Sequence, residues 1–163
     1  MNTKIVSVFP DCGKYNPIKL DCKFANIYVN KYRKMPGTFA PNPEFPGNYL
    51  DVVDRCVNKF KVILVTSNPA IRIPLAEKYP KDLVVIYFRS DEETKKNLIE
   101  AITKGNSVIS EPDNNYINLI KNNWDHWHTE AELFCIENKI PYIEVSNTKE
   151  AEDAIKALLK ENN

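Results

Sequence analysis

A glycine and a lysine that follow a short apolar segment are the first residues of this chain whose types and spacing suggest chemistry. Residues 5–9 read Ile-Val-Ser-Val-Phe, which predicts a buried strand that ends at Pro10. A strand followed by a Gly-Lys turn has the outline of a phosphate-binding loop, where backbone N–H groups surround an anion and the lysine neutralises its charge. The turn therefore predicts an anion site, formed by Asp11, Cys12, Gly13, Lys14 and Tyr15.

This turn matches the phosphate-binding pattern only in part. The full pattern is Gly, four residues, Gly-Lys, then Ser or Thr. Val8 stands at the position of the first Gly, and Tyr15 stands at the position of the hydroxyl that binds magnesium, so only Gly13 and Lys14 match. The alternatives are ordinary: Lys14 could be a solvated turn lysine, and Tyr15 could pack against the loop instead of stacking on a base or ribose.

Five further polar residues lie at or beyond the ends of predicted strands. Asp21 could accept a hydrogen bond from a ribose hydroxyl or cap a turn; Ser67 and Asn68 could contact a ligand, or Asn68 could cap the next helix. Arg72 and Arg89 could bind a phosphate through charge-assisted hydrogen bonds, or each could form a surface ion pair. We assign no catalytic residue and no metal ligand from the sequence.

Composition and charge exclude several classes of protein. The 163 residues include 22 Lys plus Arg and 22 Asp plus Glu, and this neutral balance argues against a protein that coats nucleic acid. The longest apolar run has six residues, far too few for a membrane span. No signal peptide is expected, because the N-terminus leads directly into a strand. These features predict one cytoplasmic domain over residues 1–163.

The cysteines and histidines do not predict a metal site. The cysteines are widely spaced without a C-x-x-C pair, which predicts reduced thiols; they are Cys12, Cys22, Cys56 and Cys135. His126 and His128 are two positions apart on a predicted helix, so their side chains point in different directions and cannot share a metal.

Apolar periodicity places strands and helices in alternation. Strands are predicted at 5–9, 18–22, 61–66, 83–88 and 141–146. Helices are predicted at about 27–33, 48–60, 69–79, 91–104, 113–138 and 147–160. The rest of 23–45 is predicted to be irregular because it is rich in proline. The part of the chain at about 89–138 is expected to form a lid-like helical segment.

Local signals predict how individual helices begin and continue. Ser90 with Glu93, and Asn147 with Glu150, have the spacing of capping boxes. Pro74 falls inside the helix at 69–79, so we expect a kink or a split there.

Alternating strands and helices predict an α/β fold with a parallel sheet and helices on both faces. The strand at 5–9 is expected in the centre of the sheet. Ligands of such sheets bind at the carboxyl ends of the strands, where the candidate residues lie.

Four segments together resemble one family. They are 5–14, the Asn-Pro-Glu-Phe-Pro-Gly-Asn-Tyr run at 42–49, Gly105-Asn106, and the Asn-Trp-Asp-His-Trp run at 123–127. Over about residues 4–135 the chain resembles the small P-loop nucleotide-kinase-like proteins of bacteriophages that infect low-GC bacteria. This resemblance implies a P-loop-kinase-like fold with strand order 2-3-1-4-5. It also implies nucleoside or deoxynucleoside monophosphate kinase activity with ATP and magnesium.

The chain departs from that family where the catalytic parts belong. Besides the changes in the loop, only three residues separate Lys14 from the next predicted strand, so the helix that normally follows the loop is missing. Ala101 and Lys104 stand where the family carries lid arginines, and Thr66-Ser67-Asn68 replaces Ser-Ser-His. Phosphoryl transfer depends on such charge clamps and on Mg²⁺.

Three functional hypotheses follow. The first is a phage-encoded protein that binds, without cofactors, a nucleotide-derived molecule such as an immune signal and sequesters it without turning it over. The second is an active nucleoside monophosphate kinase that uses ATP and magnesium. The third is a protein-interaction module that presents the proline-rich segment at 35–46. Neither a nucleic acid nor a membrane is expected as a partner.

Overall fold

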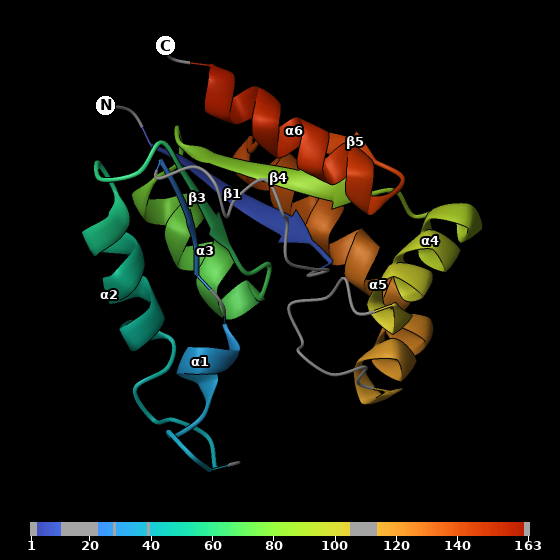
Figure 1. Cartoon of the computed structure of the whole chain (residues 1–163), viewed down its shortest axis with the longest axis horizontal. Coiled ribbons are helices and arrows are strands. Elements are labelled where there is room, and N and C mark those ends of the chain that lie inside the picture. Colours follow the sequence, from blue (N-terminus) through green and yellow to red (C-terminus); the bar gives the residue numbers. More distant parts are fainter. Residues whose placement is uncertain (1–2, 11–22, 28, 39, 105–113, 162–163) are drawn as a thin grey trace.

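Five short apolar segments form a sheet in the computed structural model, which describes residues 3–10, 23–27, 29–38, 40–104 and 114–161 (Figure 1). All pairings between neighbouring strands are parallel, and the order is 2-3-1-4-5. The predicted α/β fold with a five-stranded parallel sheet, its strand order and the central position of the first strand are therefore confirmed. The strands are β1 (Lys4–Phe9), β2 (Phe24–Asn26), β3 (Val62–Val65), β4 (Leu83–Phe88) and β5 (Tyr142–Val145).

The second strand differs from the prediction. Residues 24–26 were expected to be irregular, but they form β2, which pairs with β3 from Phe24 opposite Val62 to Asn26 opposite Leu64. A strand of three residues is too short to show an alternating pattern, which explains the error. The strand predicted at 18–22 lies outside the described residues.

The helices largely follow their apolar periodicity and their end signals. They are α1 (Asn30–Arg33), α2 (Gly47–Cys56), α3 (Pro69–Lys78), α4 (Glu92–Thr103), α5 (Asn114–Asn138) and α6 (Thr148–Lys160). Asn147 caps α6 as predicted, since its Oδ1 accepts from the Glu150 N–H at 2.9 Å. Of the two alternatives at Pro74, a kink or a split, the split is wrong, because α3 continues through Pro74; the kink stays a prediction.

The predicted cap of α4 is also wrong by one residue. Asp91, not Ser90, is the N-cap, and its Oδ1 accepts from the Thr94 N–H at 2.7 Å. A carboxylate accepts this hydrogen bond more strongly than a hydroxyl and also complements the positive end of the helix dipole.

Side chains alternate along the strands and produce two apolar cores. On one face of the sheet, residues such as Ile5, Ile63 and Val85 pack with α2, α3 and the second half of α5. On the other face, residues such as Val6 and Ile86 pack with α4, α6 and the first half of α5. The long helix α5 therefore contributes to both cores, with Trp124 in the second and Phe134 in the first.

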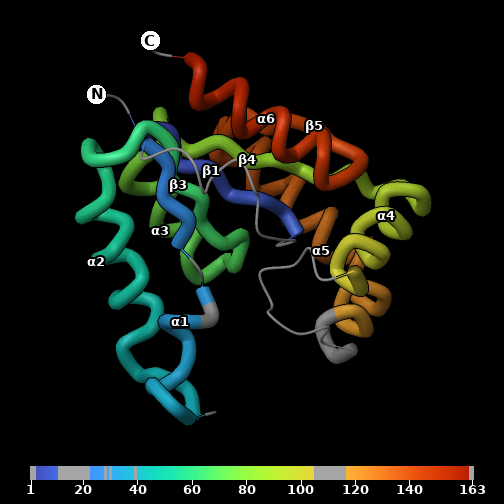
Figure 2. The backbone as a smooth tube through the Cα atoms, in the orientation of Figure 1, coloured from blue at the N-terminus to red at the C-terminus, as the bar shows by residue number. Residues whose placement is uncertain are grey.

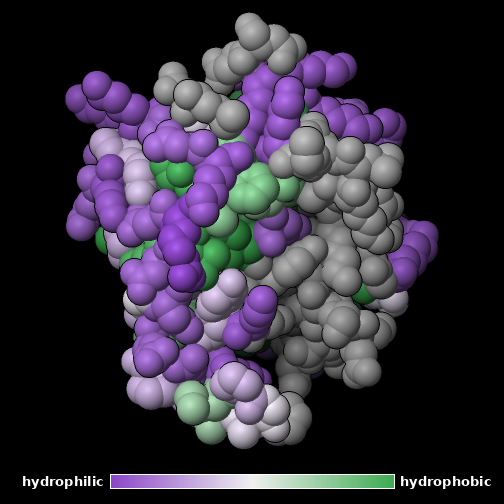
Figure 3. Space-filling model, turned by 60° about the vertical axis from the view of Figure 1, so that its left-hand side comes forward, coloured by the Kyte–Doolittle hydropathy of each residue, from purple (hydrophilic) through white to green (hydrophobic). Residues whose placement is uncertain are grey.

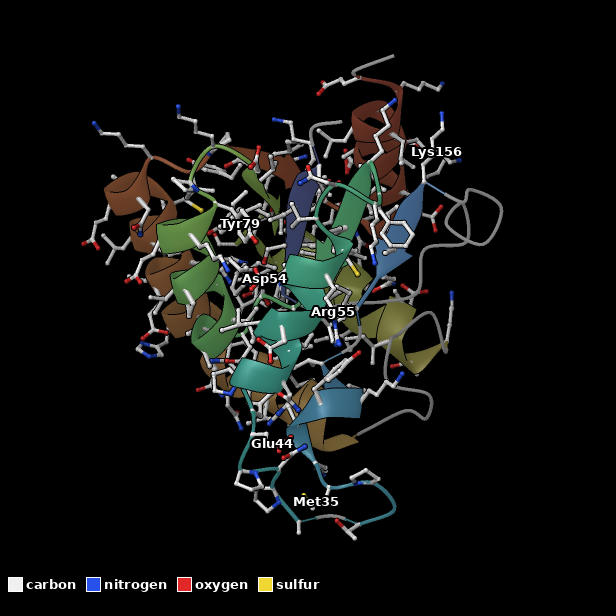
Figure 4. All side chains as sticks on the ribbon, turned by 90° about the vertical axis from the view of Figure 1, so that its left-hand side faces the viewer. Met35, Glu44, Asp54, Arg55, Tyr79 and Lys156 are labelled. Carbon is white, nitrogen blue, oxygen red and sulfur yellow. The ribbon has the colours of Figure 1, made fainter. Side chains whose placement is uncertain are left out.

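Helices α2 and α3 are joined by a polar contact at the surface. Asp54 and Tyr79 point toward each other (Figure 4), and the Tyr79 hydroxyl donates to Asp54 Oδ1 at 2.5 Å. Lys78 Nζ donates to the other carboxylate oxygen at 2.7 Å. Partial burial and this hydrogen bond to Asp54 raise the pKa of Tyr79 to about 12.

The end of the molecule formed by α1 and the segment after it lies opposite α6 (Figure 2). Met35 and Glu44 mark this end and Lys156 marks the other (Figure 4). On the face shown in Figure 3, hydrophilic side chains border a central hydrophobic area. Among the described residues, every helix is too short or too polar to cross a membrane.

Candidate functional site

A cavity of about 310 Å³ opens at the carboxyl ends of β1 and β3. Phe9 and Pro10 form its wall at the end of β1, and Ser67 and Asn68 form the wall after β3. Because the strands are parallel, both ends lie at the same edge of the sheet, where the sequence predicted a ligand site. The remaining lining comes from helices and comprises Arg33, Pro69, Arg72, Leu119, Trp127 and Glu130.

Arg72 is the most unusual residue of this cavity. It lies on α3 and is only 7% exposed. Within the described part of the chain, no carboxylate lies within ion-pair distance of its guanidinium, and its buried Nε has no hydrogen-bond partner. The alternative of a surface ion pair for Arg72 is therefore wrong.

The guanidinium of Arg72 lies against an aromatic ring, and Cys135 and Glu130 influence its pKa from a distance. Its guanidinium lies over the ring of Phe134, 4.9 Å from the ring centroid, which is a cation–π contact. Burial lowers the pKa of the Arg72 guanidinium, and the nearby Cys135 and Glu130 oppose this shift. The same burial raises the pKa of the Cys135 thiol to about 11. The site thus holds a cation that burial disfavours and that no described acidic group neutralises by contact.

Helix α3 begins at the cavity, but its first N–H groups are already used. Pro69 has no N–H, Ala70 N–H donates to Asn68 Oδ1 at 2.9 Å, and Ile71 N–H donates to Asn68 O at 2.9 Å. Asn68 is therefore the helix cap that the sequence allowed as its ordinary role. An anion in the cavity would gain from the positive end of the helix dipole, but its direct hydrogen bonds would have to come from side chains.

The wall formed by α5 is held in place by His128. This residue is 3% exposed, and its ring nitrogens lie 2.6 Å from Trp124 O and 2.8 Å from Phe88 O. The ring also contacts the edge of Phe9, with centroids 4.9 Å apart. These contacts fix α5 against β4 and β1, and so they set the positions of Trp127 and Glu130 beside the cavity.

Arg89 occupies a different hollow. It lies just beyond β4 with Ser90, Asp91, Glu132 and Glu144, together with two tyrosines, Tyr87 and Tyr142. Its side chain is 46% exposed and lies 3.9 Å from the carboxylate of Glu150. The structure therefore brings Ser67, Asn68 and Arg72 together and leaves Arg89 apart from them. Its role as a surface ion-pair residue, which the sequence allowed, matches this geometry.

The other predicted site residues belong to the turn after β1, except Asp21, which comes later in the chain. Asp11, Cys12, Gly13, Lys14, Tyr15 and Asp21 lie outside the described residues. Val8, by contrast, lies within β1 and is 2% exposed, so the position of the first loop glycine belongs to a strand.

Sequence reasoning missed three charged or aromatic residues of the cavity. Arg33 comes from a short helix in a segment expected to be mostly irregular, and Glu130 gave no signal beyond an exposed helical position. Trp127 lies in the run at 123–127 and was not assigned to the site; it packs partly against the core while it lines the cavity. The Trp-Asp-His-Trp run at 124–127 is one of the segments of the family resemblance, and that resemblance was the only signal that could have indicated a site residue here.

Comparisons with protein-family models, with curated proteins and with solved structures give no match. The functional argument therefore depends on the geometry of the cavity.

Proposed function

We propose that the cavity at the ends of β1 and β3 binds a phosphate-bearing small molecule, a nucleotide or a nucleotide derivative, and that the protein does not turn it over. The more specific form of the proposal is sequestration of a nucleotide-derived signal by a phage-type protein with a P-loop-kinase-like fold. Strand order 2-3-1-4-5 and the placement of the cavity at the carboxyl edge support this form.

The observation that carries the proposal is the buried guanidinium of Arg72, which no carboxylate of the described residues pairs. Burying a cation without a partner is costly, and proteins normally pair such a group with an acid. An anionic ligand would supply the missing partner, and guanidinium groups bind phosphate through two parallel hydrogen bonds. Arg33, which is exposed and also lines the cavity, could contribute a second positive charge.

The apolar part of the cavity suits the rest of a nucleotide. Phe9, Leu119 and Trp127 offer hydrophobic and aromatic surface, on which a base can stack. A volume of about 310 Å³ is at the lower end of the range for small-molecule pockets, roughly 300–1,000 Å³. Glu130 supplies an acceptor that can bind a hydroxyl or amino group of the ligand.

Absence of turnover is proposed because the groups that phosphoryl transfer needs are altered. Val8 is buried in β1, where a kinase loop would begin, and Ala101 on α4 replaces a lid arginine implied by the family resemblance. A coupled assay with ATP, magnesium and the common monophosphates should show turnover far below the usual lower range of enzymes, roughly 1 s⁻¹. Turnover at or above that rate would favour the kinase hypothesis.

The test of binding is titration calorimetry with a panel of mononucleotides, cyclic dinucleotides and ADP-ribose. We expect at least one of these compounds to release heat with the wild type. Arg72→Gln should weaken its binding by about a hundredfold, because a charge-assisted, two-pronged contact is worth about 1.5–3 kcal/mol. The matched control is Arg55→Gln, an exposed arginine of α2 (Figure 4), which should bind like the wild type.

Two results would overturn the proposal. One is no heat from any compound of the panel with the wild type, after which the interaction-module hypothesis for residues 35–46 would take its place. That segment includes Met35, whose side chain is 42% exposed at one end of the molecule. The other is equal binding by wild type and Arg72→Gln, which would place the ligand elsewhere.

A further inference from the structure

Tyr49 connects the ends of two strands at the cavity. It is 0% exposed at the start of α2, and its hydroxyl donates to Ile27 O at 2.7 Å, just beyond β2. The same hydroxyl accepts from the Thr66 N–H at 3.0 Å, just beyond β3. Since Ser67 follows Thr66 directly, the hydroxyl of Tyr49 fixes the point at which the chain leaves the sheet and enters the cavity wall.

A short series of hydrogen bonds continues from Tyr49 to Arg72. Asn68 N–H donates to Thr66 Oγ1 at 3.2 Å, and Arg72 N–H donates to Asn68 O at 3.0 Å. Ser7 Oγ also donates to Thr66 O at 3.3 Å from the central strand. The position of the Arg72 backbone therefore depends on the Thr66–Asn68 turn that Tyr49 holds.

Asn48, the residue before Tyr49, contacts the chain beside Arg33, the second arginine of the cavity. Its Nδ2 donates to Tyr32 O at 3.0 Å, and Tyr32 directly precedes Arg33. The rings of Tyr32 and Tyr49 also meet edge to face, with centroids 5.4 Å apart. Asn48 thus contacts the backbone next to Arg33, and Tyr49 contacts the start of the turn that leads to the helix of Arg72.

We propose that Asn48 and Tyr49 are positioning residues that set the separation between Arg33 and Arg72, and so the spacing of positive charge that an anionic ligand meets. This inference rests on the proposed function for its purpose, although its geometry can be tested without a ligand. It also gives a role to the Asn-Pro-Glu-Phe-Pro-Gly-Asn-Tyr segment, which ends with these two residues.

The direct test uses the side-chain Nε–Hε resonances of Arg33 and Arg72 in ¹⁵N-labelled protein. Tyr49→Phe removes one hydroxyl and keeps the ring, and we expect it to shift the Arg72 resonance. Asn48→Ala should shift the Arg33 resonance. The matched control is Val53→Ala, which opens space one turn later in the same core, lowers stability, and should leave both resonances in place.

The functional arm measures the affinity of the folded variants for adenosine 5′-monophosphate and for inorganic phosphate. Tyr49→Phe should weaken binding by about tenfold, since a misplacement of about 1 Å can cost about a hundredfold and the loss of one hydroxyl should displace Arg72 by less than that. Val53→Ala should bind like the wild type despite its lower stability. If Tyr49 had only a structural role, Tyr49→Phe and Val53→Ala would bind the two probes with the same affinity.

The outcomes separate this inference from the proposed function. If the wild type binds neither probe, nor any compound of the calorimetry panel, the proposed function fails, and the arginine resonances still decide whether Asn48 and Tyr49 position the two side chains. If the wild type binds but Tyr49→Phe matches Val53→Ala in both affinity and resonances, the positioning role is wrong and the proposed function stands.

Discussion

Arg72 and Arg89 line two different hollows at the same edge of the sheet, and the two side chains are in opposite situations. Arg72 is buried beside Phe134 and contacts no described carboxylate, whereas Arg89 is half exposed and lies near Glu150. The hollow of Arg89 contains three acids, Asp91, Glu132 and Glu144, and the cavity of Arg72 contains one, Glu130. Burial without a described acidic partner therefore distinguishes Arg72 from Arg89, and it is the reason why we propose a ligand site only at Arg72.

The largest effect is expected when the cavity of Arg72 is made to resemble the hollow of Arg89. Leu119 lines the cavity and is 49% exposed, so a longer polar side chain can be placed there without disturbing a core. Leu119→Glu should weaken binding of a phosphate-bearing ligand by about a hundredfold, because the carboxylate repels the phosphate and attracts the guanidinium.

Leu119→Gln is the matched control, since it has nearly the same shape without the charge. Calorimetry should show its affinity within a few-fold of the wild type. Equal losses in the two variants would mean that shape, rather than the unmatched charge of Arg72, determines binding.

A smaller effect is expected on stability. Arg72→Met keeps most of the apolar stem and removes a buried cation that no described acid neutralises by contact. Because burial already disfavours the charged form, the free energy of unfolding should rise by about 1 kcal/mol even after the loss of the contact with Phe134. Urea denaturation measures this change.

Arg89→Met provides the contrast in the other hollow. An exposed ion pair contributes about 0–1 kcal/mol, so its loss should change stability only slightly. If Arg72→Met instead lowered stability by more than Arg89→Met, the guanidinium would have stabilising partners of its own, and the argument for a ligand would weaken.

The smallest effect concerns Glu150, the partner of Arg89. Hydrogen bonds from the side chain and the backbone N–H of Ser146 lower the pKa of this carboxyl, and Arg89 adds to the shift. A lowered pKa in the folded state stabilises the protein above the ordinary pKa of a glutamate, and this contribution is lost as the pH falls through the folded value.

Glu150→Gln should therefore cost a fraction of a kcal/mol at neutral pH, and its difference from the wild type should disappear in acid. Thermal unfolding across this pH range measures it. Arg89→Met should change the pH dependence much less than Glu150→Gln, since the Ser146 hydrogen bonds come first among the causes. A larger change in Arg89→Met would mean that the ion pair is stronger than its 3.9 Å separation indicates.

Much of the sheet was predictable from the sequence because two of its inner strands are continuous apolar runs. Val62–Val65 and Leu83–Phe88 are buried at every position, which is how strands of a parallel sheet covered on both faces appear. The three-residue strand β2 was missed because so short a segment carries no period. The cap of α4 was predicted at Ser90 instead of Asp91 because two residues that can cap a helix are adjacent in the sequence. The capping-box spacing alone does not distinguish between them.

The candidate site was less predictable than the fold. Ser67, Asn68 and Arg72 could be placed at a strand end, but the burial of Arg72 depends on Phe134, which comes from a helix far along the chain. The same is true of Glu130 and Trp127, which face the cavity only because His128 holds α5 against β4. Arg72 and Arg89 looked alike in the sequence, and only tertiary packing separates them.

Native mass spectrometry tests the central claim most directly. The wild type, Arg72→Gln and Arg89→Gln would be incubated with the same panel of mononucleotides, cyclic dinucleotides and ADP-ribose. We predict that the wild type and Arg89→Gln retain one phosphate-bearing ligand per chain and that Arg72→Gln retains none. A wild type that retains no ligand, or an Arg72→Gln variant with the same occupancy as the wild type, would contradict the claim that the buried guanidinium of Arg72 forms an anion site.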